Sequence, residues 1–258
     1  MLATAIEAAR EAGKILKQHL GNVRDVRRKS GQEKNLVTEI DKRSEEAIIR
    51  IIKRHHPGHS ILAEETGRKG GESDFTWIID PLDGTTNYVH ALPVFCVSIG
   101  LEHKGTIVAG VIYDPNTDEL FSAERGGGAF LNGKRIRVSD VDSLGKSLLV
   151  TGFPYTIAED PGPAVAHFVR FLTRAQAVRR MGSAAIDLAY VAAGRFDGFW
   201  EASLNPWDMA AGVLLVEEAG GCVSGFSGQP FSIYGQELVA SNRLVHQEMI
   251  ETLSSRSG

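Results

Sequence analysis

Acidic residues stand where predicted secondary-structure elements of this 258-residue chain end. Asp80 closes the apolar run Phe75–Ile79, and Asp83 follows three residues later, just before Gly84 and two threonines. Pro81 forces the chain to turn between the two acids. Two carboxylates at a strand end suit a hard divalent cation, and free N–H groups beyond them can hold a phosphate oxygen. A lone D-x-x-D pattern is about equally compatible with an Asp-capped turn.

Two further acids also lie at element ends. Glu64 follows the short apolar run Ser60–Ala63, and Asp208 stands where an Asn-Pro pair opens a predicted helix. Taken singly, a solvated loop acid and a helix-capping acid are the better interpretations. Together with Asp80 and Asp83 they form a set of carboxylates, which suits magnesium or manganese rather than zinc or copper. We therefore predict a divalent-cation site built from these four acids.

The composition is that of an ordinary globular protein, with 43% hydrophobic and 23% charged residues. The net charge of -4 argues against binding nucleic acid through overall charge. Cys96 and Cys222 are far apart in the sequence, so we expect no disulfide framework and a reducing, cytoplasmic location. No apolar run approaches the length of a membrane span, and the N-terminal stretch lacks the core of a signal peptide.

The N-terminal part of the chain shows helical periodicity. Apolar residues at helical spacing predict a surface helix over residues 2–20. Asp41 is predicted as the N-cap of a second helix, which ends near Pro57. The basic stretch between them, residues 24–32, is predicted to be a turn or a mobile loop.

The remaining chain is predicted to change from strands to alternating helices and strands. Residues 60–140 read as strands, with a hairpin turning at His103-Lys104-Gly105 and another tight turn at Asn132-Gly133. Helices are predicted over residues 163–174, 183–193, 207–219 and 243–253. The chain is therefore of mixed α/β (α+β) class. The polar seam at residues 140–146 divides it into an N-terminal α+β lobe, 1–143, and a C-terminal α/β lobe, 144–258.

Longer segments of the chain resemble the inositol monophosphatase family. They are GHSILAEE, WIIDPLDGTTNYVH, GSAAIDLAYVAAGRFDGFWE and NPWDMAAGVLLVEEAGG, preceded by NLVTEIDKRSEE. They occur in the family's order, from residue 5 to about residue 250, and the detail is most similar to the bacterial extragenic-suppressor branch. The resemblance implies the layered α-β-α-β-α sandwich of the inositol monophosphatase and fructose-1,6-bisphosphatase superfamily. It also implies a homodimer with a cleft between the two lobes.

The same resemblance assigns metal ligands by motif. One metal would contact Glu64, Asp80 and the backbone carbonyl of Leu82. A second would contact Asp80, Asp83 and Asp208, and a third, weaker one would lie near Glu64 through water. The implied cofactor is Mg²⁺, two or three ions per subunit, with Mn²⁺ as a substitute.

The resemblance also assigns the groups that handle water and substrate. Thr85 and Asp41 would orient and deprotonate the attacking water, and the amides of Gly84 and Thr85 would hold the phosphate. A mobile loop would supply a lysine, either Lys29 or Lys34. The remaining substrate contacts would be Asp83, Gly182, Ser183, Ala184, Glu201 and Asp208. From the residues alone, Glu201 is more readily a solvated acid at the end of the strand Phe196–Trp200.

These arguments predict a magnesium-dependent phosphomonoesterase for inositol 1-phosphate or a similar polyol phosphate, working by direct attack of metal-activated water. A fructose-1,6-bisphosphatase or a dual-specificity sugar phosphatase is the alternative within the superfamily. An aspartate-nucleophile phosphatase is disfavoured, because the acids of DPLDGTT are three residues apart rather than two. An alternative of another class is an accessory protein of transcription or ribosomal RNA maturation that binds RNA polymerase. Its only local hints are the basic residues 24–29 and Arg179-Arg180.

Overall fold

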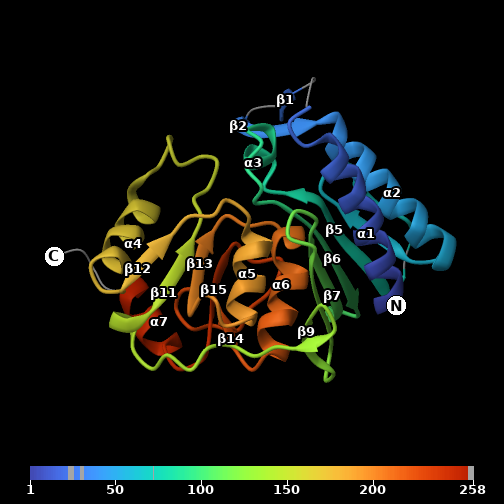
Figure 1. Cartoon of the computed structure of the whole chain (residues 1–258). Helices are drawn as coiled ribbons and strands as arrows, with labels where there is room; N and C mark the ends of the chain where they lie inside the picture. The colour runs from blue at the N-terminus through green and yellow to red at the C-terminus, as the bar shows by residue number, and fades with distance from the viewer. Residues whose placement is uncertain (23–25, 30–31, 72, 255–258) are drawn as a thin grey trace.

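The structure is a computed structural model and describes residues 1–22, 26–29, 32–71 and 73–254. Two large sheets alternate with pairs of helices, so that the order of layers is helix, sheet, helix, sheet, helix (Figure 1). This arrangement confirms the predicted layered sandwich. None of the helices in the described part of the chain is long and apolar enough to cross a membrane.

The larger sheet has eight strands in the order β10-β9-β8-β7-β6-β5-β3-β4. All neighbours are antiparallel except β3 and β5, which are parallel. Lys104-Gly105 and Asn132-Gly133 form the predicted tight turns, and positive φ at all four residues matches turns that favour glycine and asparagine. The strands are β3 (Ser60–Ala63), β4 (Gly67–Lys69), β5 (Phe75–Asp83), β6 (Cys96–His103), β7 (Thr106–Asp114), β8 (Glu119–Glu124), β9 (Gly128–Leu131) and β10 (Lys134–Arg135).

Helices α1 (Leu2–His19) and α2 (Glu39–His55) cover one face of this sheet (Figure 1). Helix α2 begins one turn earlier than predicted, because Thr38 rather than Asp41 is its N-cap. The Thr38 hydroxyl accepts from the amides of Ile40 and Asp41, while the Asp41 carboxylate accepts from the Thr38 amide. Asp41 is therefore the third helical residue, and its side chain points back toward the start of the helix.

The basic stretch after α1 was predicted as a turn or mobile loop, and this is wrong for its described residues. They form β1 (Val26–Lys29), paired antiparallel with β2 (Gln32–Thr38). Val26 pairs with Thr38, twelve residues further along the chain. The charged residues of the stretch gave no indication of this pairing, because strand formation depends on such distant partners. The side chains of Lys29 and Lys34 lie outside the described residues, so the choice between them stays open.

The second sheet is built from the C-terminal part of the chain, in the order β12-β11-β13-β15-β14. Its outer face carries α4 (Gly162–Leu172) and α7 (His246–Ser254), which lie near the predicted helices. A short 3-10 helix, η1 (Leu144–Lys146), leads into it. The strands are β11 (Leu148–Thr151), β12 (Ala177–Arg179), β13 (Gly198–Ala202), β14 (Cys222–Ser224) and β15 (Glu237–Ser241).

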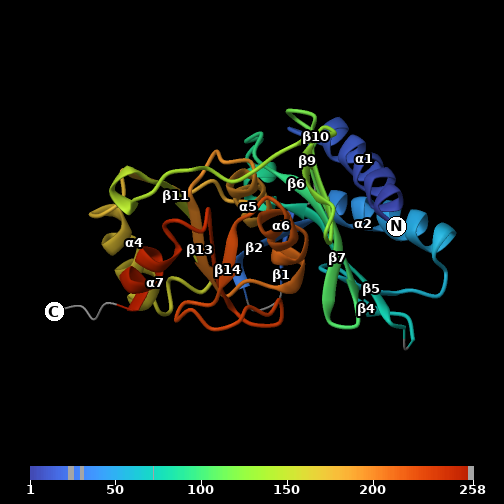
Figure 2. The same ribbon diagram turned by 90° about the horizontal axis from the view of Figure 1, so that it is seen from below.

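Helices α5 (Ala184–Ala192) and α6 (Pro206–Glu218) form the middle layer between the sheets (Figure 2). Residues 209–216 of α6 are all buried, as expected for a helix covered on every side. Glycines let α6 approach the larger sheet: a Cβ on Gly110 would lie 2.9 Å from the Cα of Ala211. This close packing fixes the N-terminal ends of α5 and α6 against the end of β5.

A hydrogen bond between Trp77 and His59 ties the start of β5 to the loop before β3. The fully buried Trp77 donates its indole N–H to Nδ1 of His59 at 3.1 Å. The His59 ring stacks on Phe75 and on His56, with ring centroids 4.8 Å apart in each case. Burial lowers the pKa of His59, and the neighbouring His56 and Lys53 lower it further. A neutral His59 is therefore the form that fits the fold, since a protonated ring offers no acceptor to Trp77.

We predict that lowering the pH destabilises the protein through His59. Because its folded pKa lies below the unfolded value of 6.5, the stabilisation is complete above that value and is lost as the pH falls through the folded pKa. His59→Asn keeps an acceptor that does not titrate, so urea unfolding at several pH values should show a shallower decline in unfolding free energy. Exposed His90→Asn is the matched control, and an equal flattening in both variants would contradict the prediction.

Candidate active site

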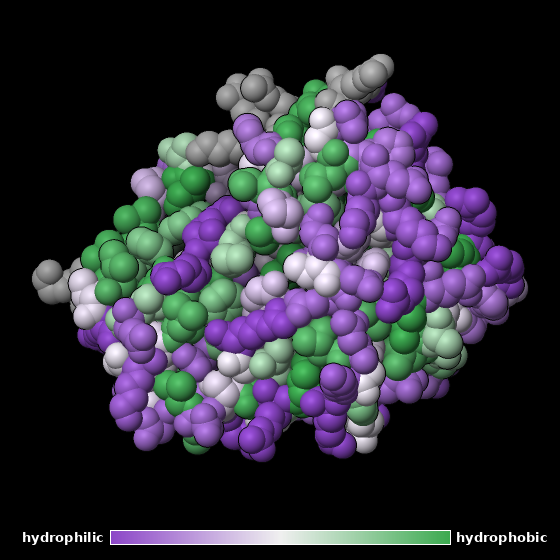
Figure 3. Space-filling view, viewed as in Figure 1, coloured by the Kyte–Doolittle hydropathy of each residue, from purple (hydrophilic) through white to green (hydrophobic). Residues whose placement is uncertain are grey.

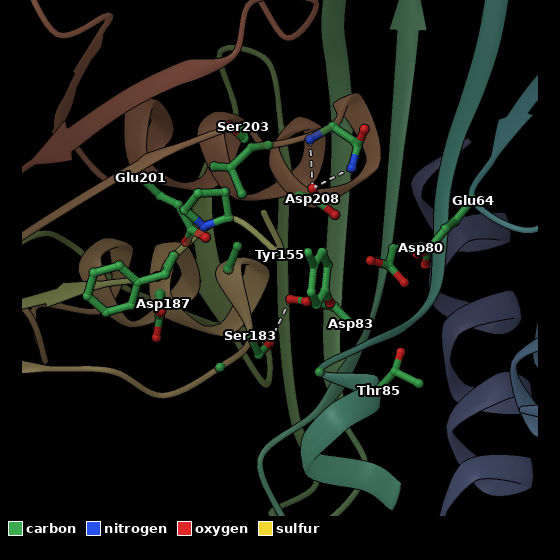
Figure 4. A pocket seen from close by; sticks show the side chains of 18 of the residues that line it. Glu64, Asp80, Asp83, Thr85, Tyr155, Ser183, Asp187, Glu201, Ser203 and Asp208 are labelled. Carbon is green, nitrogen blue, oxygen red and sulfur yellow. Dashed lines mark hydrogen bonds between the residues drawn. The ribbon is translucent and has the colours of Figure 1, made fainter. Parts of the chain in front are cut away.

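Parallel pairing of β3 and β5 brings the first two acids together. Ala63 pairs with Ile79, and the amide of Glu64 donates to the Ile79 carbonyl at 3.1 Å. Because parallel strands end at the same edge of a sheet, Glu64 then stands beside Asp80. Figure 4 shows their side chains on the same wall of the cleft.

A bulge in β5 places the next acid. The strand does not end at Asp80, as predicted, but runs to Asp83 with a register shift between them. Asp80 pairs with Ser98 and Asp83 with Cys96, so the intervening Pro81 has no ladder partner. Proline lacks an N–H and suits such a position, and bulges often re-aim side chains beside active sites. The bulge therefore turns Asp83 toward the cleft that Asp80 lines.

Asp208 reaches the cleft from the N-terminus of α6. Its carboxylate accepts from the Asn205 amide at 2.7 Å as part of a capping box. Its pKa is raised well above the usual range by burial and by Asp83 and Glu64. Capping and membership of the acid cluster were weighed as competing interpretations of Asp208. The structure shows that one residue does both.

The four acids line one shared cavity of about 100 Å³ between the two sheets (Figure 4). Of the other predicted residues, Leu82, Gly84, Thr85, Gly182, Ser183, Ala184 and Glu201 also line it. The remaining lining residues are Gly152, Phe153, Pro154, Tyr155, Arg180, Asp187, Ser203, Leu204 and Asn205. Asp41 stands behind this wall rather than on it.

Burial and, after it, electrostatic repulsion raise the pKa values of the clustered acids. Burial raises the pKa of Asp80 well above its usual range, and the charges of Glu64, Asp83 and Asp208 raise it further. Burial also raises the pKa of Asp83 to about 6, although Ser183 and the Ala185 amide stabilise its charged form. Converging carboxylates deprived of water require positive charge nearby.

The donor set fits a hard divalent cation. The carboxylates and the Leu82 carbonyl are oxygen ligands of the kind that Mg²⁺ and Mn²⁺ prefer. Within the described ranges, no group of three or more His, Cys, Asp or Glu side chains is arranged closely enough to hold a metal ion as it stands. The fit therefore rests on the chemistry and shared location of the oxygen donors.

Thr85 connects the cavity to the buried Asp41. The Thr85 hydroxyl can donate to the Leu82 carbonyl at 3.0 Å or to Asp41 at 3.3 Å. Asp41 is 1% exposed, and burial raises its pKa to about 6 despite hydrogen bonds from Thr38. Asp41 can therefore contact a ligand in the cavity only through Thr85.

The N-termini of α3 and α5 both lie next to Asp83 in the cleft. Gly84 has φ 94° and precedes the short helix α3 (Thr85–Val89), and a Cβ here would lie 2.8 Å from the Val94 carbonyl. From α5, the Ser183 hydroxyl and the Ala185 amide each donate to Asp83 at 2.7 Å. Asp83 thus joins the turn predicted to hold the phosphate to the turn predicted to contact the substrate.

Glu201 lies at the other end of the cavity from Glu64 and Asp80 (Figure 4). Its carboxyl stands directly over Gly152, where an added Cβ would lie 2.2 Å from the carboxyl oxygens. Burial raises the pKa of Glu201 to about 8, opposed by Arg180. The predicted substrate residue is therefore a protein-enclosed carboxyl on the cavity wall and not a solvated strand-end acid.

Among the nine unpredicted lining residues, the three titratable ones are Tyr155, Arg180 and Asp187. Tyr155 lies over the acid cluster in Figure 4, and burial and the four acids raise its pKa, so its phenol stays neutral. Arg180 was considered only as a hint of nucleic-acid binding. Asp187 lies on the first turn of α5, where an acid is ordinarily explained by the helix dipole. Only the tertiary arrangement shows that all three face the cavity.

Comparisons with known proteins agree with this fold and site. The model of the "Inositol monophosphatase family" matches residues 1–257. A Synechocystis protein named inositol-1-monophosphatase is 46% identical over 255 residues, covering 98% of this chain and 88% of the relative. An Escherichia coli protein named Nus factor SuhB is 43% identical over 254 residues, covering 98% of this chain and 95% of the relative.

Solved structures are similar over nearly the whole chain. The inositol monophosphatase of Anabaena (Nostoc) has a TM-score of 0.89 at 47% identity, covering 98% of this chain and 94% of that one. The extragenic suppressor protein suhB of Bartonella henselae has a TM-score of 0.94 at 39% identity, covering 99% and 98%. The fold and site define a phosphatase of the layered α-β-α-β-α type. The chain belongs to the inositol monophosphatase family.

We predict that neutralising one clustered acid stabilises the metal-free protein. Asp80→Asn removes a buried charge that three neighbouring acids repel, so unfolding free energy in the presence of EDTA should rise by roughly 1–2 kcal/mol. Urea denaturation at about pH 8, where the acids are ionised most fully, measures the change.

Asp197→Asn is the control for Asp80→Asn. Asp197 is also buried, but its two oxygens accept from the Ser139 hydroxyl and the Leu148 amide, so the substitution should destabilise the protein. A loss of stability in Asp80→Asn as large as in the control would contradict the repulsion described here.

Proposed function

We propose that this phosphatase hydrolyses inositol 1-phosphate or a similar polyol monophosphate with the help of Mg²⁺. The observation that carries the proposal is the convergence of Glu64, Asp80, Asp83 and Asp208 on one cavity whose other end is lined by Glu201. Acids at one end suit cations that hold a phosphoryl group. A carboxyl and backbone groups at the other end suit hydroxyls. The names of the Synechocystis and Anabaena relatives support the same substrate class.

In this proposal, two or three Mg²⁺ ions are held by Glu64, Asp80, Asp83, Asp208 and the Leu82 carbonyl, with Mn²⁺ as a substitute. Divalent cations neutralise phosphoryl charge and lower the pKa of water, which is the chemistry they supply when bound. The amides of Gly84 and Thr85 bind phosphoryl oxygens at the turn into α3. In this proposal, water attacks phosphorus directly and no covalent phosphoenzyme forms.

The chain's own proton acceptor is the Thr85–Asp41 pair, and Glu64 is the third residue assigned to catalysis on the same cavity. When Thr85 donates to Asp41, its oxygen can accept a proton from water in the cavity. A pKa of about 6 suits Asp41 to receive a proton near neutral pH. At the other end, Asp83, Glu201, Asp208 and the Gly182-Ser183-Ala184 turn position the alcohol. Fructose 1,6-bisphosphate stays an alternative substrate for the same site.

The proposed assembly is a cytoplasmic homodimer. Large apolar side chains stand exposed on α4: Val165, Val169 and Leu172. Figure 3 shows hydrophobic residues gathered over this end of the molecule. Exposed apolar surface of this kind favours association. The two cysteines are unpaired, which agrees with a reducing compartment.

A role beside catalysis is the second candidate function. Relatives in Escherichia coli and Salmonella typhimurium are named Nus factor SuhB, which suggests association with RNA polymerase or RNA. Co-purification of RNA polymerase with an inactive Asp83→Asn variant as efficiently as with wild type would favour a role independent of hydrolysis.

We predict Mg²⁺-dependent phosphate release that prefers inositol 1-phosphate. The measurement compares it with fructose 1,6-bisphosphate, glycerol 2-phosphate and 3′-phosphoadenosine 5′-phosphate, each with and without Mg²⁺ and Li⁺. Lithium should inhibit. Asp208→Asn should fold and lose roughly 10- to 100-fold in kcat/KM, because one of the cation-facing charges is gone. Full activity in EDTA, or a wild-type rate in Asp208→Asn, would contradict the proposal.

A further inference from the structure

Asp187 is a buried carboxyl that the fold itself does not use. It is 1% exposed, on the first turn of α5, and it lines the cavity. Its Oδ1 atom has no hydrogen-bond partner in the part of the chain that the structure describes. A buried polar atom left without a partner destabilises a folded protein. Such an atom on a cavity wall points to a ligand that completes it.

The surroundings of Asp187 place it at the alcohol end of the cleft. It lies one helical turn after Ser183, whose hydroxyl binds Asp83, so a single helix spans both ends of the site. Figure 4 shows Asp187 and Glu201 on the same side, away from Glu64 and Asp80. Arg180 is the cation whose charge acts on both Asp187 and Glu201.

The side chains at the Asp187–Glu201 end of the cavity indicate which functional group of a ligand binds there. Burial, Glu201 and Asp83 raise the pKa of Asp187 well above its usual range, which favours the protonated, neutral form of the carboxyl. A neutral carboxylic acid donates one hydrogen bond and accepts another. An alcohol hydroxyl has the same pair of capacities, whereas a second phosphate would meet the acids Asp187 and Glu201.

We propose that Asp187 is a specificity-determining residue that binds a hydroxyl group of the substrate alcohol, together with Glu201. The inference rests on the proposed polyol phosphatase function and deepens it. It assigns recognition of the ring hydroxyls to α5 as well as to β13. It also explains why an unpartnered carboxyl is retained in an otherwise apolar helix, whose neighbours Ala185, Ile186 and Leu188 are buried.

The test compares two phosphate esters that differ only in ring hydroxyls, inositol 1-phosphate and cyclohexyl phosphate. Asp187→Ala should lose about tenfold in kcat/KM for inositol 1-phosphate, mainly through KM, as expected for one hydrogen bond to a buried group. Its kcat/KM for cyclohexyl phosphate should stay close to the wild-type value. Asp187→Asn retains a donor and an acceptor and should recover most of the loss.

Stability separates this role from a structural one. Asp187→Ala should unfold at the wild-type urea midpoint or above it, because no hydrogen bond of the fold is lost. Asp197→Asn, the buried control described above, should be less stable and yet keep the wild-type ratio of the two esters. Equal losses on both esters, or no loss on either, in Asp187→Ala would overturn the inference.

A binding measurement keeps the inference independent of hydrolysis. Ligand-observed NMR with myo-inositol alone should show weaker binding to Asp187→Ala than to wild type. Equal binding to both proteins, or none to either, would also overturn the role of Asp187. Absence of phosphate release from either ester by wild type with Mg²⁺ would instead contradict the proposed function, and the myo-inositol comparison would still decide the role of Asp187.

Discussion

Repulsion among carboxylates that the protein holds away from water is the constraint on which this structure depends. Asp80 is 2% exposed and feels the charges of Glu64, Asp83 and Asp208 at once. Such an arrangement is costly to fold and is useful only when cations compensate it. In the proposed function, the negative charges that repel one another in the metal-free cluster would be the same charges that attract Mg²⁺.

The layered fold keeps the four acids close together despite their mutual repulsion. Parallel pairing of β3 with β5 sets Glu64 beside Asp80, and the bulge at Pro81 turns Asp83 to the same side. Close packing of α6 on the larger sheet brings Asp208 from the C-terminal half of the chain. Because each acid is fixed by backbone hydrogen bonds of its own element, the acids cannot simply move apart. The similarity to members of the inositol monophosphatase family extends over nearly the whole chain, so it includes all the elements that place the acids.

Much of the site could be predicted from the sequence, because its acids stand at element ends and within long family-like segments. The predictions that failed concern features that depend on contacts between residues distant in the sequence. The N-cap of α2 is Thr38 and not Asp41; both residue types can cap a helix, so the sequence did not decide between them. The pairing of β1 with β2 was not predicted, because the segment is rich in charged residues. Nothing in the sequence singles out Asp187, because an acid on the first turn of a helix is ordinarily explained by the helix dipole. Its orphaned oxygen and its place on the cavity wall become visible only when α5 is packed between the sheets.

Calorimetric titration of Mg²⁺ into the EDTA-treated and dialysed protein tests the central claim most directly. The account predicts saturable binding of at least two ions per chain, and loss of at least one of them in a double variant Asp80→Asn/Asp83→Asn. Saturable binding that is unchanged in the double variant, or no saturable binding by the wild-type chain, would contradict it.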